Sequence, residues 1–207
     1  FIYASSGSVY GVKEEPQVTE ELSLLPISDY NKTKMISERV LMSYEHNIVL
    51  QIIRPATVCG YSPRMRLDLS VSMLTMQALK NGEITVFGGN QTRPNIHMND
   101  MIGVYLHFLQ LGQKATGIYN AGFENLTILE LANKIKKHIN TQIFIKESND
   151  PRSYRQNSDK LISTNFYPSF TVDDAIKEII ELYNEGKLTE KKEYVLNSIN
   201  KESKLEI

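Results

Sequence analysis

Apolar and polar residues alternate along the first sixty positions in a way that predicts a strand, a helix and a second strand. Residues 1–4 form an apolar, β-prone run that leads into the small residues 5–8, where the backbone turns easily. Ser28 supplies a helix start, and residues 30–45 carry apolar side chains at helical spacing. The apolar run 48–53 is too short for a helix and predicts a strand that is covered on both faces. This order of elements is typical of an α/β fold.

After Pro63 the pattern changes, and we expect a second, smaller lobe to begin there. Its helices are predicted from their ends, because capping residues open a helix and glycine commonly follows the last turn. The predicted elements are a helix over 70–80 that stops at Asn81-Gly82, a strand over 84–87, a turn at Gly88-Gly89, a helix capped by Asn99 or Asp100, a helix opened by the capping box Thr127-x-x-Glu130, and a helix from Thr171-x-x-Asp174 to Gly186. The polar composition from Thr189 onward predicts a solvated helix or a frayed end.

The composition is that of an ordinary globular protein, because 207 residues with 41% hydrophobic content can form one substantial core or two small ones. Lys plus Arg (23) nearly cancel Asp plus Glu (24), so no overall field favours nucleic acid or an anionic membrane. Cys59 is the single cysteine and no Cys/His cluster has zinc spacing, which favours a reducing, cytoplasmic setting without a metal. No apolar run is long enough to predict a membrane span. The start at Phe1, inside a β-prone run, predicts an internal boundary of a longer chain.

Tyr30 and Lys34 lie four residues apart at the start of the predicted helix, so both side chains fall on one face. A nearby ammonium stabilises the phenolate form of a tyrosine, which is what a general base for an alcohol needs. Taken alone, this spacing favours an ordinary surface pair, because many helices carry Tyr and Lys four residues apart by chance. The serine cluster upstream, in the segment Ser5-Ser6-Gly7-Ser8-Val9-Tyr10-Gly11, reverses that balance.

Together these motifs resemble the extended short-chain dehydrogenases/reductases that act on nucleotide sugars, in the NAD-dependent epimerase/dehydratase family. The likeness consists of Ser-Ser-x-x-Val-Tyr-Gly at 5–11, Tyr-x-x-x-Lys at 30–34 and Arg-Pro-Ala-Thr-Val-Cys-Gly at 54–60, and it continues through 63–68, 82–100, 119–122 and 150–160. By that likeness Ser6, Tyr30 and Lys34 form the catalytic set. Ser6 would bond the reacting sugar hydroxyl, Tyr30 would remove its proton, and Lys34 would hold the cofactor ribose. The alternative for Ser6 is an ordinary turn serine.

The same likeness implies two sets of binding residues. The cofactor would contact Ala4, Ser5, Tyr30, Lys34, Pro55, Thr57 and Val58, and the sugar nucleotide would contact Ser6, Thr57, Val86, Arg93, Arg152 and Arg155. Arg93 would grip the diphosphate, because a planar guanidinium can bond two oxygens. The alternatives are a surface charge at Arg93 and a solvated basic loop at Arg152 and Arg155. His97 and Asp100 would shape a loop and cap a helix rather than take part in catalysis.

The resemblance implies an α/β fold with a partial, Rossmann-like, doubly wound parallel sheet and a smaller substrate-binding lobe. Residues 1–62 would be the C-terminal part of the NAD(P)-binding domain, 63–186 mainly the substrate-binding lobe with elements that return to the Rossmann core, and 187–207 a polar tail. The family's Gly-x-x-Gly-x-x-Gly motif, which binds the cofactor pyrophosphate at a helix N-terminus, is absent from the sequence. We therefore expect binding of NAD, with NADP as the alternative, to be incomplete without further sequence upstream.

The leading functional hypothesis is an NAD-dependent nucleotide-sugar epimerase, which oxidises one sugar carbon and re-reduces it through a keto intermediate. Gly7-Ser8 stand where 4,6-dehydratases of the family carry an Asp-Glu pair, so loss of water is unsupported. A 4-ketoreductase or dehydratase of the same family is the alternative among enzymes. A non-catalytic nucleotide-sugar-binding remnant or a structural subunit is the alternative of another class. The expected partners are a nucleotide-diphosphate sugar and, by the likeness, a second copy in a homodimer, with no nucleic acid or membrane.

Overall fold

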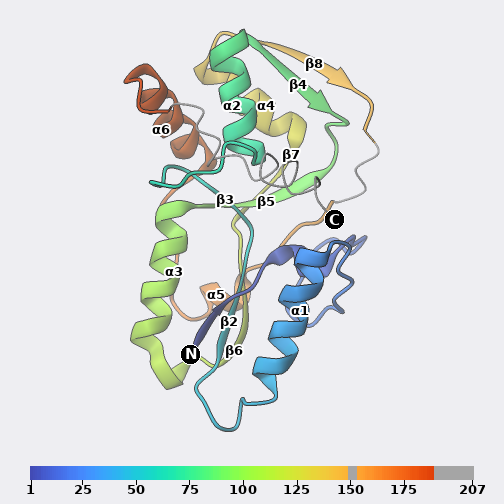
Figure 1. The fold of residues 1–207 in the computed structure, drawn as a ribbon, viewed down its shortest axis with the longest axis vertical. Coiled ribbons are helices and arrows are strands. Elements are labelled where there is room, and N and C mark those ends of the chain that lie inside the picture. The colour runs from blue at the N-terminus through green and yellow to red at the C-terminus, as the bar shows by residue number, and fades with distance from the viewer. Residues whose placement is uncertain (149–152, 189–207) are drawn as a thin grey trace, which may run out of the picture.

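The computed structural model describes residues 1–148 and 153–188 and arranges their strands in three sheets (Figure 1). The lower sheet in that view is parallel, in the order β1 (Ile2–Ala4), β2 (Gln51–Pro55) and β6 (Gly117–Ala121). A second sheet contains β3 (Thr57–Cys59), β5 (Thr92–His97) and β7 (Glu124–Thr127), and a third pairs β4 (Glu83–Phe87) with β8 (Gln142–Lys146). Parallel strands with helices around them confirm the predicted α/β class.

The helices cover both faces of the lower sheet and pack on one side of the two-stranded sheet at the other end. They are α1 (Asp29–Met42), α2 (Ser70–Asn81), α3 (Met98–Leu111), α4 (Ile128–His138), α5 (Asp159–Ile162) and α6 (Val172–Asn184), with the 3₁₀ helices η1 (Gly7–Tyr10) and η2 (Gly112–Lys114). Figure 1 shows α1 and α3 on opposite sides of the lower sheet. Ile53 packs in one core with Phe108 of α3, whereas the next residue, Arg54, pairs with Glu38 of α1. This alternation places consecutive side chains of β2 on opposite faces.

Two large apolar cores, and a smaller cluster of Val9, Tyr10 and Val18, hold the described residues together. One lies between β2, β6 and α3 and contains Ile53, Val104 and Phe108, which are almost fully buried. The other joins α2, α4 and α6 to β4, with Leu74 and Ile135 at its centre. The first core collects residues from Ile2 to Phe166, and the lower sheet gains its third strand when β6 returns to pair with β2.

Most predicted helix ends are confirmed because their signals are local. Thr127 and Thr171 both form complete capping boxes, in which the side chain of the third helical residue bonds back to the capping residue. Gly82 ends α2 with a φ of 68°, the left-handed conformation that glycine adopts without a steric penalty. Gly186, predicted to end the last helix, lies one residue beyond the cap, with the same φ of 68°.

Three predicted boundaries are wrong. α1 ends at Met42 and not near residue 45, because residues 43–47 form consecutive turns. β2 begins at Gln51 and not at Ile48, whose side chain is 38% exposed at the edge of the fold. The cap of α3 is His97, neither Asn99 nor Asp100, since Nδ1 of His97 accepts from the backbone N–H of Asn99 at 3.2 Å. The carboxylate of Asp100 instead accepts from two backbone N–H groups just before α6.

Two sequence predictions fall outside the described residues, namely Arg152 and nearly all of the polar tail at 187–207. Within residues 1–148 and 153–188, every helix is too short or too polar to cross a bilayer.

Candidate functional site

The carboxyl ends of β1 and β2 and the start of α1 enclose a cavity of about 600 Å³. Ligands of parallel α/β sheets bind in this position, because the loops that follow the strands leave a crevice there. Ser6, Ser8 and Tyr30 contribute polar groups to the lining, whereas Ile27 and Leu69 contribute apolar surface. A few hydrogen-bonding groups within an apolar lining are typical of small-molecule sites.

Ser6 lies at the point where β1 gives way to η1. Its hydroxyl caps η1 by accepting from the backbone N–H of Ser8 at 3.2 Å. The Ser6 and Ser8 hydroxyls are 2.7 Å apart, and the Ser8 hydroxyl donates to Oδ1 of Asn31 at 2.6 Å. Ser6 is thus a turn serine and a cavity-lining hydroxyl at once. The same hydrogen bonds connect its Oγ to the first turn of α1.

Tyr30 and Lys34 occupy one face of the first two turns of α1. The Ser28 hydroxyl begins the helix by accepting from the backbone N–H of Asn31 at 3.2 Å. The Tyr30 side chain lines the cavity and is 57% exposed. Nζ of Lys34 lies 5.8 Å from the centre of the Tyr30 ring and donates to the carbonyl of Ala4 at 2.7 Å. The helix start therefore presents a phenol to the cavity with an ammonium group beside it.

The residues predicted to contact the cofactor gather at this end of the sheet. Besides Tyr30, four of them line the cavity: Ser5, Pro55, Thr57 and Val58. The Ala4 carbonyl bonds the ammonium of Lys34 just outside that lining. These groups fit the nicotinamide and ribose end of NAD, because an ammonium and hydroxyls can bond ribose oxygens beside an apolar wall. A glycine-rich cradle for the pyrophosphate is absent from the sequence, so the fit covers one end of the cofactor.

The residues predicted to contact the sugar nucleotide do not all meet in this cavity. Thr57 joins Ser6 in the lining, but Val86, on β4, is fully buried in the core between β4 and the helices α2, α4 and α6. Arg93 lies on β5, and Arg155 lines a separate cavity of about 270 Å³.

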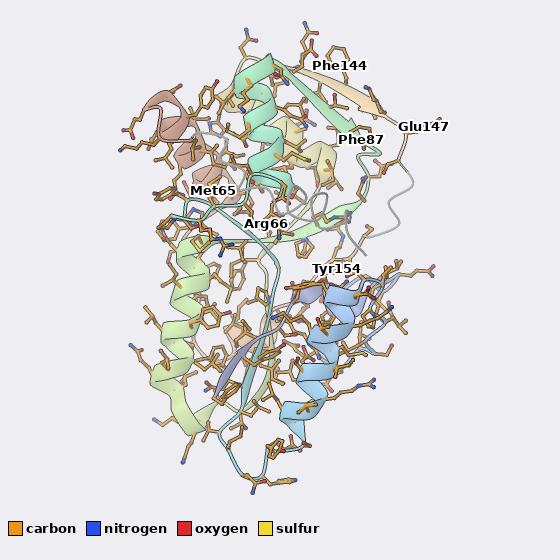
Figure 2. All side chains as sticks on the ribbon, viewed as in Figure 1. Met65, Arg66, Phe87, Phe144, Glu147 and Tyr154 are labelled. Carbon is orange, nitrogen blue, oxygen red and sulfur yellow. The ribbon has the colours of Figure 1, made fainter. Side chains whose placement is uncertain are left out.

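Several side chains of the lining were not selected by sequence reasoning, and the largest polar ones among them are Arg66 and Tyr154. Both lie inside segments that the family likeness included, and Figure 2 labels them between the lower sheet and the upper lobe. The Arg66 guanidinium bonds both carboxylate oxygens of Asp68, at 2.9 and 2.8 Å. These bonds raise its pKa, to which the nearby Tyr30 also contributes. The sequence did offer one signal for Arg66, namely a cationic residue within a matched motif. Whether its side chain points into the cavity depends on the tertiary fold.

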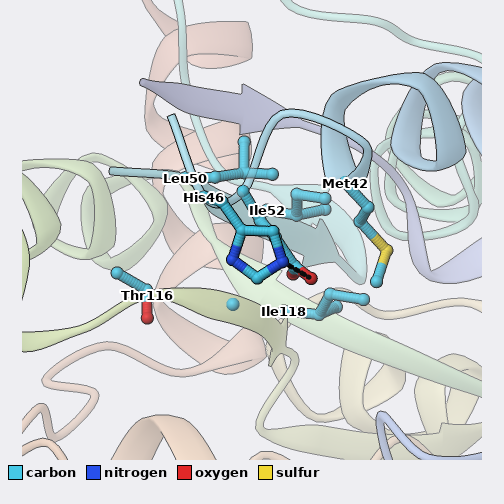
Figure 3. Close-up of a pocket in the computed structure, with 8 residues that line it drawn as sticks. Met42, His46, Leu50, Ile52, Thr116 and Ile118 are labelled. Atoms are coloured by element: carbon cyan, nitrogen blue, oxygen red, sulfur yellow. Dashed lines mark ion pairs between the residues drawn. The ribbon is translucent and has the colours of Figure 1, made fainter. Parts of the chain in front are cut away.

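Another cavity, of about 260 Å³, lies at the opposite end of the lower sheet, between the end of α1 and the starts of β2 and β6 (Figure 3). Its lining includes Leu50, Ile118 and the exposed pair of Glu45 and His46, 3.9 Å apart. Predicted site residues do not reach it, and it lies away from the strand ends where such folds bind ligands. Among the described residues, no group of three or more metal-ligating side chains is close enough to hold an ion.

Comparisons with known proteins agree with this geometry. Residues 1–122 match the model of the NAD dependent epimerase/dehydratase family. An uncharacterized UDP-glucose epimerase of Bacillus subtilis is 34% identical over 103 residues, which are 49% of this chain and 32% of the relative. The dTDP-D-glucose 4,6-dehydratase of Bos taurus is 27% identical over 201 residues, covering 90% of this chain and 56% of the relative.

A solved structure gives the same result for the fold. The UDP-glucuronic acid 4-epimerase of Bacillus cereus, in complex with UDP-glucuronic acid and NAD, superimposes with a TM-score of 0.76 at 28% identity. The superposition covers 88% of this chain and 62% of that one, so the chain spans less than two thirds of each protein it matches here. The matched motifs, the parallel sheet and the family model agree. The chain belongs to the NAD dependent epimerase/dehydratase family, whose members are enzymes that use NAD(P).

Proposed function

We propose that this protein is an NAD-dependent nucleotide-sugar epimerase, which inverts one sugar carbon through a keto intermediate. The observation that carries the proposal is the arrangement of Ser6, Tyr30 and Lys34. Two of these side chains line one cavity, and the third lies one helical turn from Tyr30 on the same face. A phenol beside an ammonium suits proton transfer to and from an alcohol.

Each residue has a distinct part in the proposed reaction. Tyr30 takes the proton of the sugar hydroxyl, and Ser6 holds that hydroxyl by a hydrogen bond. Lys34 places its ammonium group beside the Tyr30 ring and bonds the ribose. Tyr30, Lys34 and the residues that end β2 would hold NAD, which would supply the acceptor for hydride from the sugar carbon and the donor for its return to the opposite face.

Inversion without loss of water is favoured by the residues that follow Ser6. Elimination needs an acid for the departing hydroxyl, and Gly7 and Ser8 offer none. A reductase of the same family would use the same three residues, so it is the second candidate. Its reaction consumes NAD(P)H in proportion to product, whereas epimerisation regenerates the cofactor.

In the proposed reaction residues 1–62 serve the cofactor side, and 63–186 serve mainly the lobe that binds the sugar nucleotide. The core of the lower sheet crosses this boundary, because Val104 and Phe108 of α3 return to pack with Ile53. Arg93 and either Arg152 or Arg155 are assigned to the diphosphate of the sugar nucleotide, because arginine bonds phosphate oxygens in pairs. A ligand that reaches from Thr57 to Arg93 would follow β3 and β5, which pair side by side.

The decisive experiment uses the protein as its gene encodes it. It is incubated with NAD and UDP-glucose, UDP-glucuronic acid or dTDP-glucose, and the products are followed by NMR. We expect inversion at one carbon, and Tyr30→Phe should lower kcat at least 100-fold with little change in KM, because the proton acceptor is lost. Tyr167→Phe is the matched control, since Tyr167 is an exposed tyrosine that does not line the cavity.

The other outcomes separate the alternatives. A 4-keto-6-deoxy product would indicate a dehydratase, and stoichiometric use of NAD(P)H would indicate a reductase. Binding of the UDP sugar in calorimetry without turnover would indicate a non-catalytic binding protein. Absence of both binding and turnover would contradict the proposal and leave a structural role.

A homodimer is part of the proposal. Two large apolar side chains of α1, Ile36 and Val40, are 54% and 55% exposed, and Tyr44, in the turns that follow the helix, is 55% exposed. Ile36 and Val40 lie four residues apart and so share one outer face of the helix, and together with Tyr44 they form an apolar stripe. A stripe of this kind on a helix that also carries Tyr30 and Lys34 suits packing against a second copy.

A further inference from the structure

A buried ion pair lies directly beneath the candidate site. Glu38 of α1 and Arg54 of β2 form a two-point contact, with Arg54 Nη2 to Oε2 at 2.6 Å and Nε to Oε1 at 3.0 Å. The Glu38 and Arg54 side chains are 1% and 3% exposed. The Ser5 hydroxyl also donates to the Glu38 carboxylate. One carboxylate therefore joins the end of β1, the middle of α1 and the end of β2.

The pair is extended by further buried polar groups. Nη1 of Arg54 donates to the Tyr10 hydroxyl at 2.8 Å, and that hydroxyl donates to Oδ1 of Asn120 at 2.8 Å. Burial raises the Tyr10 pKa to about 12, so its proton stays in place for this bond. Gln156 donates to the same Asn120 oxygen at 3.0 Å and to the carbonyl of Arg54 at 2.7 Å. The network thus reaches from α1 across the sheet to β6.

Stability alone is a weak reason for such a pair. Removing two charges from water is costly, and well-packed apolar residues at buried ion-pair positions are often equally or more stabilising. What an ion pair adds is a fixed orientation of the two side chains, because a guanidinium donates two parallel hydrogen bonds to a carboxylate in one geometry.

Glu38 lies on the same face of α1 as the candidate catalytic residues, so fixing its orientation also fixes theirs. Tyr30, Lys34 and Glu38 are spaced by four residues, so they follow one face of α1. Lys34 bonds the Ala4 carbonyl and Glu38 bonds the Ser5 hydroxyl, so consecutive residues of the segment before Ser6 hold consecutive turns of the helix.

We infer that Glu38 and Arg54 are positioning residues, which set the angle of α1 against β1 and so fix Tyr30 relative to Ser6. The inference rests on the proposed function for its kinetic consequence. Glu38 lies about 12 Å along the helix axis from Tyr30, given a rise of 1.5 Å per residue. A tilt of roughly 5° about Glu38 therefore moves the Tyr30 phenol by about 1 Å, a displacement that can reduce catalysis about 100-fold.

The test replaces the pair in the whole protein with apolar side chains of similar length, as Glu38→Met/Arg54→Met. Single removal of Glu38 would leave a buried guanidinium unpaired and could unfold the chain, whereas the double variant avoids that charge. We expect a melting temperature close to that of the unchanged protein, a kcat lowered about 10- to 100-fold, and a KM within threefold. Lys177→Met, which removes the exposed pair of Lys177 and Asp174 on α6, is the control and should leave all three values unchanged.

A second readout does not depend on turnover. In a crystal structure of the double variant, the distance from Tyr30 Oη to Ser6 Oγ should change by about 1 Å, as the tilt requires. A folded double variant with full kcat, or with an unchanged distance, would overturn the inference. If the unchanged protein inverts no sugar, the proposed function fails, and the crystallographic distance alone decides whether Glu38 and Arg54 position Tyr30.

Discussion

Cys59 illustrates how burial can suppress the chemistry of a single residue. It is the one cysteine of the sequence, its side chain is 6% exposed, and its Sγ lies 3.4 Å from the carbonyl of Ile96 as a donor. Burial is the largest cause that raises its pKa to about 12, and the nearby carboxylate of Glu124 adds to the effect. The thiolate is the reactive form, so this thiol should be nearly inert although it lies next to the cavity-lining segment.

We expect iodoacetamide at pH 8 to alkylate Cys59 in the native chain about 1000-fold more slowly than in the urea-unfolded chain, since each unit of pKa changes the thiolate fraction tenfold. Mass spectrometry of timed samples measures both rates. Comparable rates in the two states would show that the thiol is accessible and ionisable in the fold.

At the same scale, the candidate site shows which residues a linear motif can identify. Ser6 lies where a strand passes into a turn, and Tyr30 lies in the first turn of a helix just after its capping residue. These local patterns are enough to place both residues. Arg66 reaches the cavity from the loop between β3 and α2, and Tyr154 reaches it from a segment beyond β8. Those two positions depend on how the second lobe packs on the first, which no local pattern records.

Among the elements, α4 and α6 depend on their capping boxes. The Thr127 and Thr171 hydroxyls accept from the third helical backbone N–H, at 3.1 and 3.3 Å. We expect Thr127→Ala and Thr171→Ala each to lower the free energy of unfolding by about 1 kcal/mol, because a backbone donor loses its partner. Urea denaturation measures the change. Ser37→Ala, within α1, is the control and should be close to neutral, since alanine is favourable inside a helix.

The same capping boxes predict a contribution to acid sensitivity. The pKa of Glu130 is lowered by the Thr127 backbone N–H and hydroxyl, and that of Asp174 by the Thr171 hydroxyl and backbone N–H. A carboxyl whose pKa is lower in the folded state stabilises the fold above its unfolded pKa of about 4 and loses that effect as the pH falls through the folded value. Stability should therefore decline from about pH 5 downward.

The variant Glu130→Gln/Asp174→Asn should show a shallower decline between about pH 5 and pH 3, because the capping amides do not titrate. Urea denaturation at several pH values gives the slopes. Glu181→Gln, an exposed carboxylate inside α6 that caps no helix, serves as the comparison. Equal slopes for the capping variant and the unchanged chain would exclude the capping carboxylates as a source of acid sensitivity.

Helices were predicted well and most strands were not, for a physical reason. Caps and left-handed glycines lie next to the helices they end, whereas a strand is stabilised by a partner that can lie anywhere in the chain. β6 pairs with β2 although α2 and α3 lie between them in the sequence. β5 contains Pro94 and the buried polar residue Asn95. Such a sequence has no clear alternation, so only the pairing identifies it as a strand.

For the whole molecule, the apolar stripe on α1 gives a test of self-association. Val40→Glu places a charge at the centre of the stripe and should shift the protein from dimer to monomer, because an unpaired buried charge opposes association. Sedimentation velocity measures the mass over a range of concentrations. Ile145→Glu, at an equally exposed apolar residue of β8, is the control and should not change the mass. A monomer before substitution, or a dimer unaffected by Val40→Glu, would contradict the proposed homodimer.

The sequence by itself determined the α/β class, most helix ends, the family and the motif positions of Ser6, Tyr30 and Lys34, because each depends on residues close together in the chain. The tertiary structure decided that β6 completes the lower sheet, that Arg66 and Tyr154 face the cavity, and that Glu38 meets Arg54 beneath it. Those contacts join residues far apart in sequence. The geometry of these contacts forms only when the sheet has assembled, because assembly brings the buried polar groups into contact.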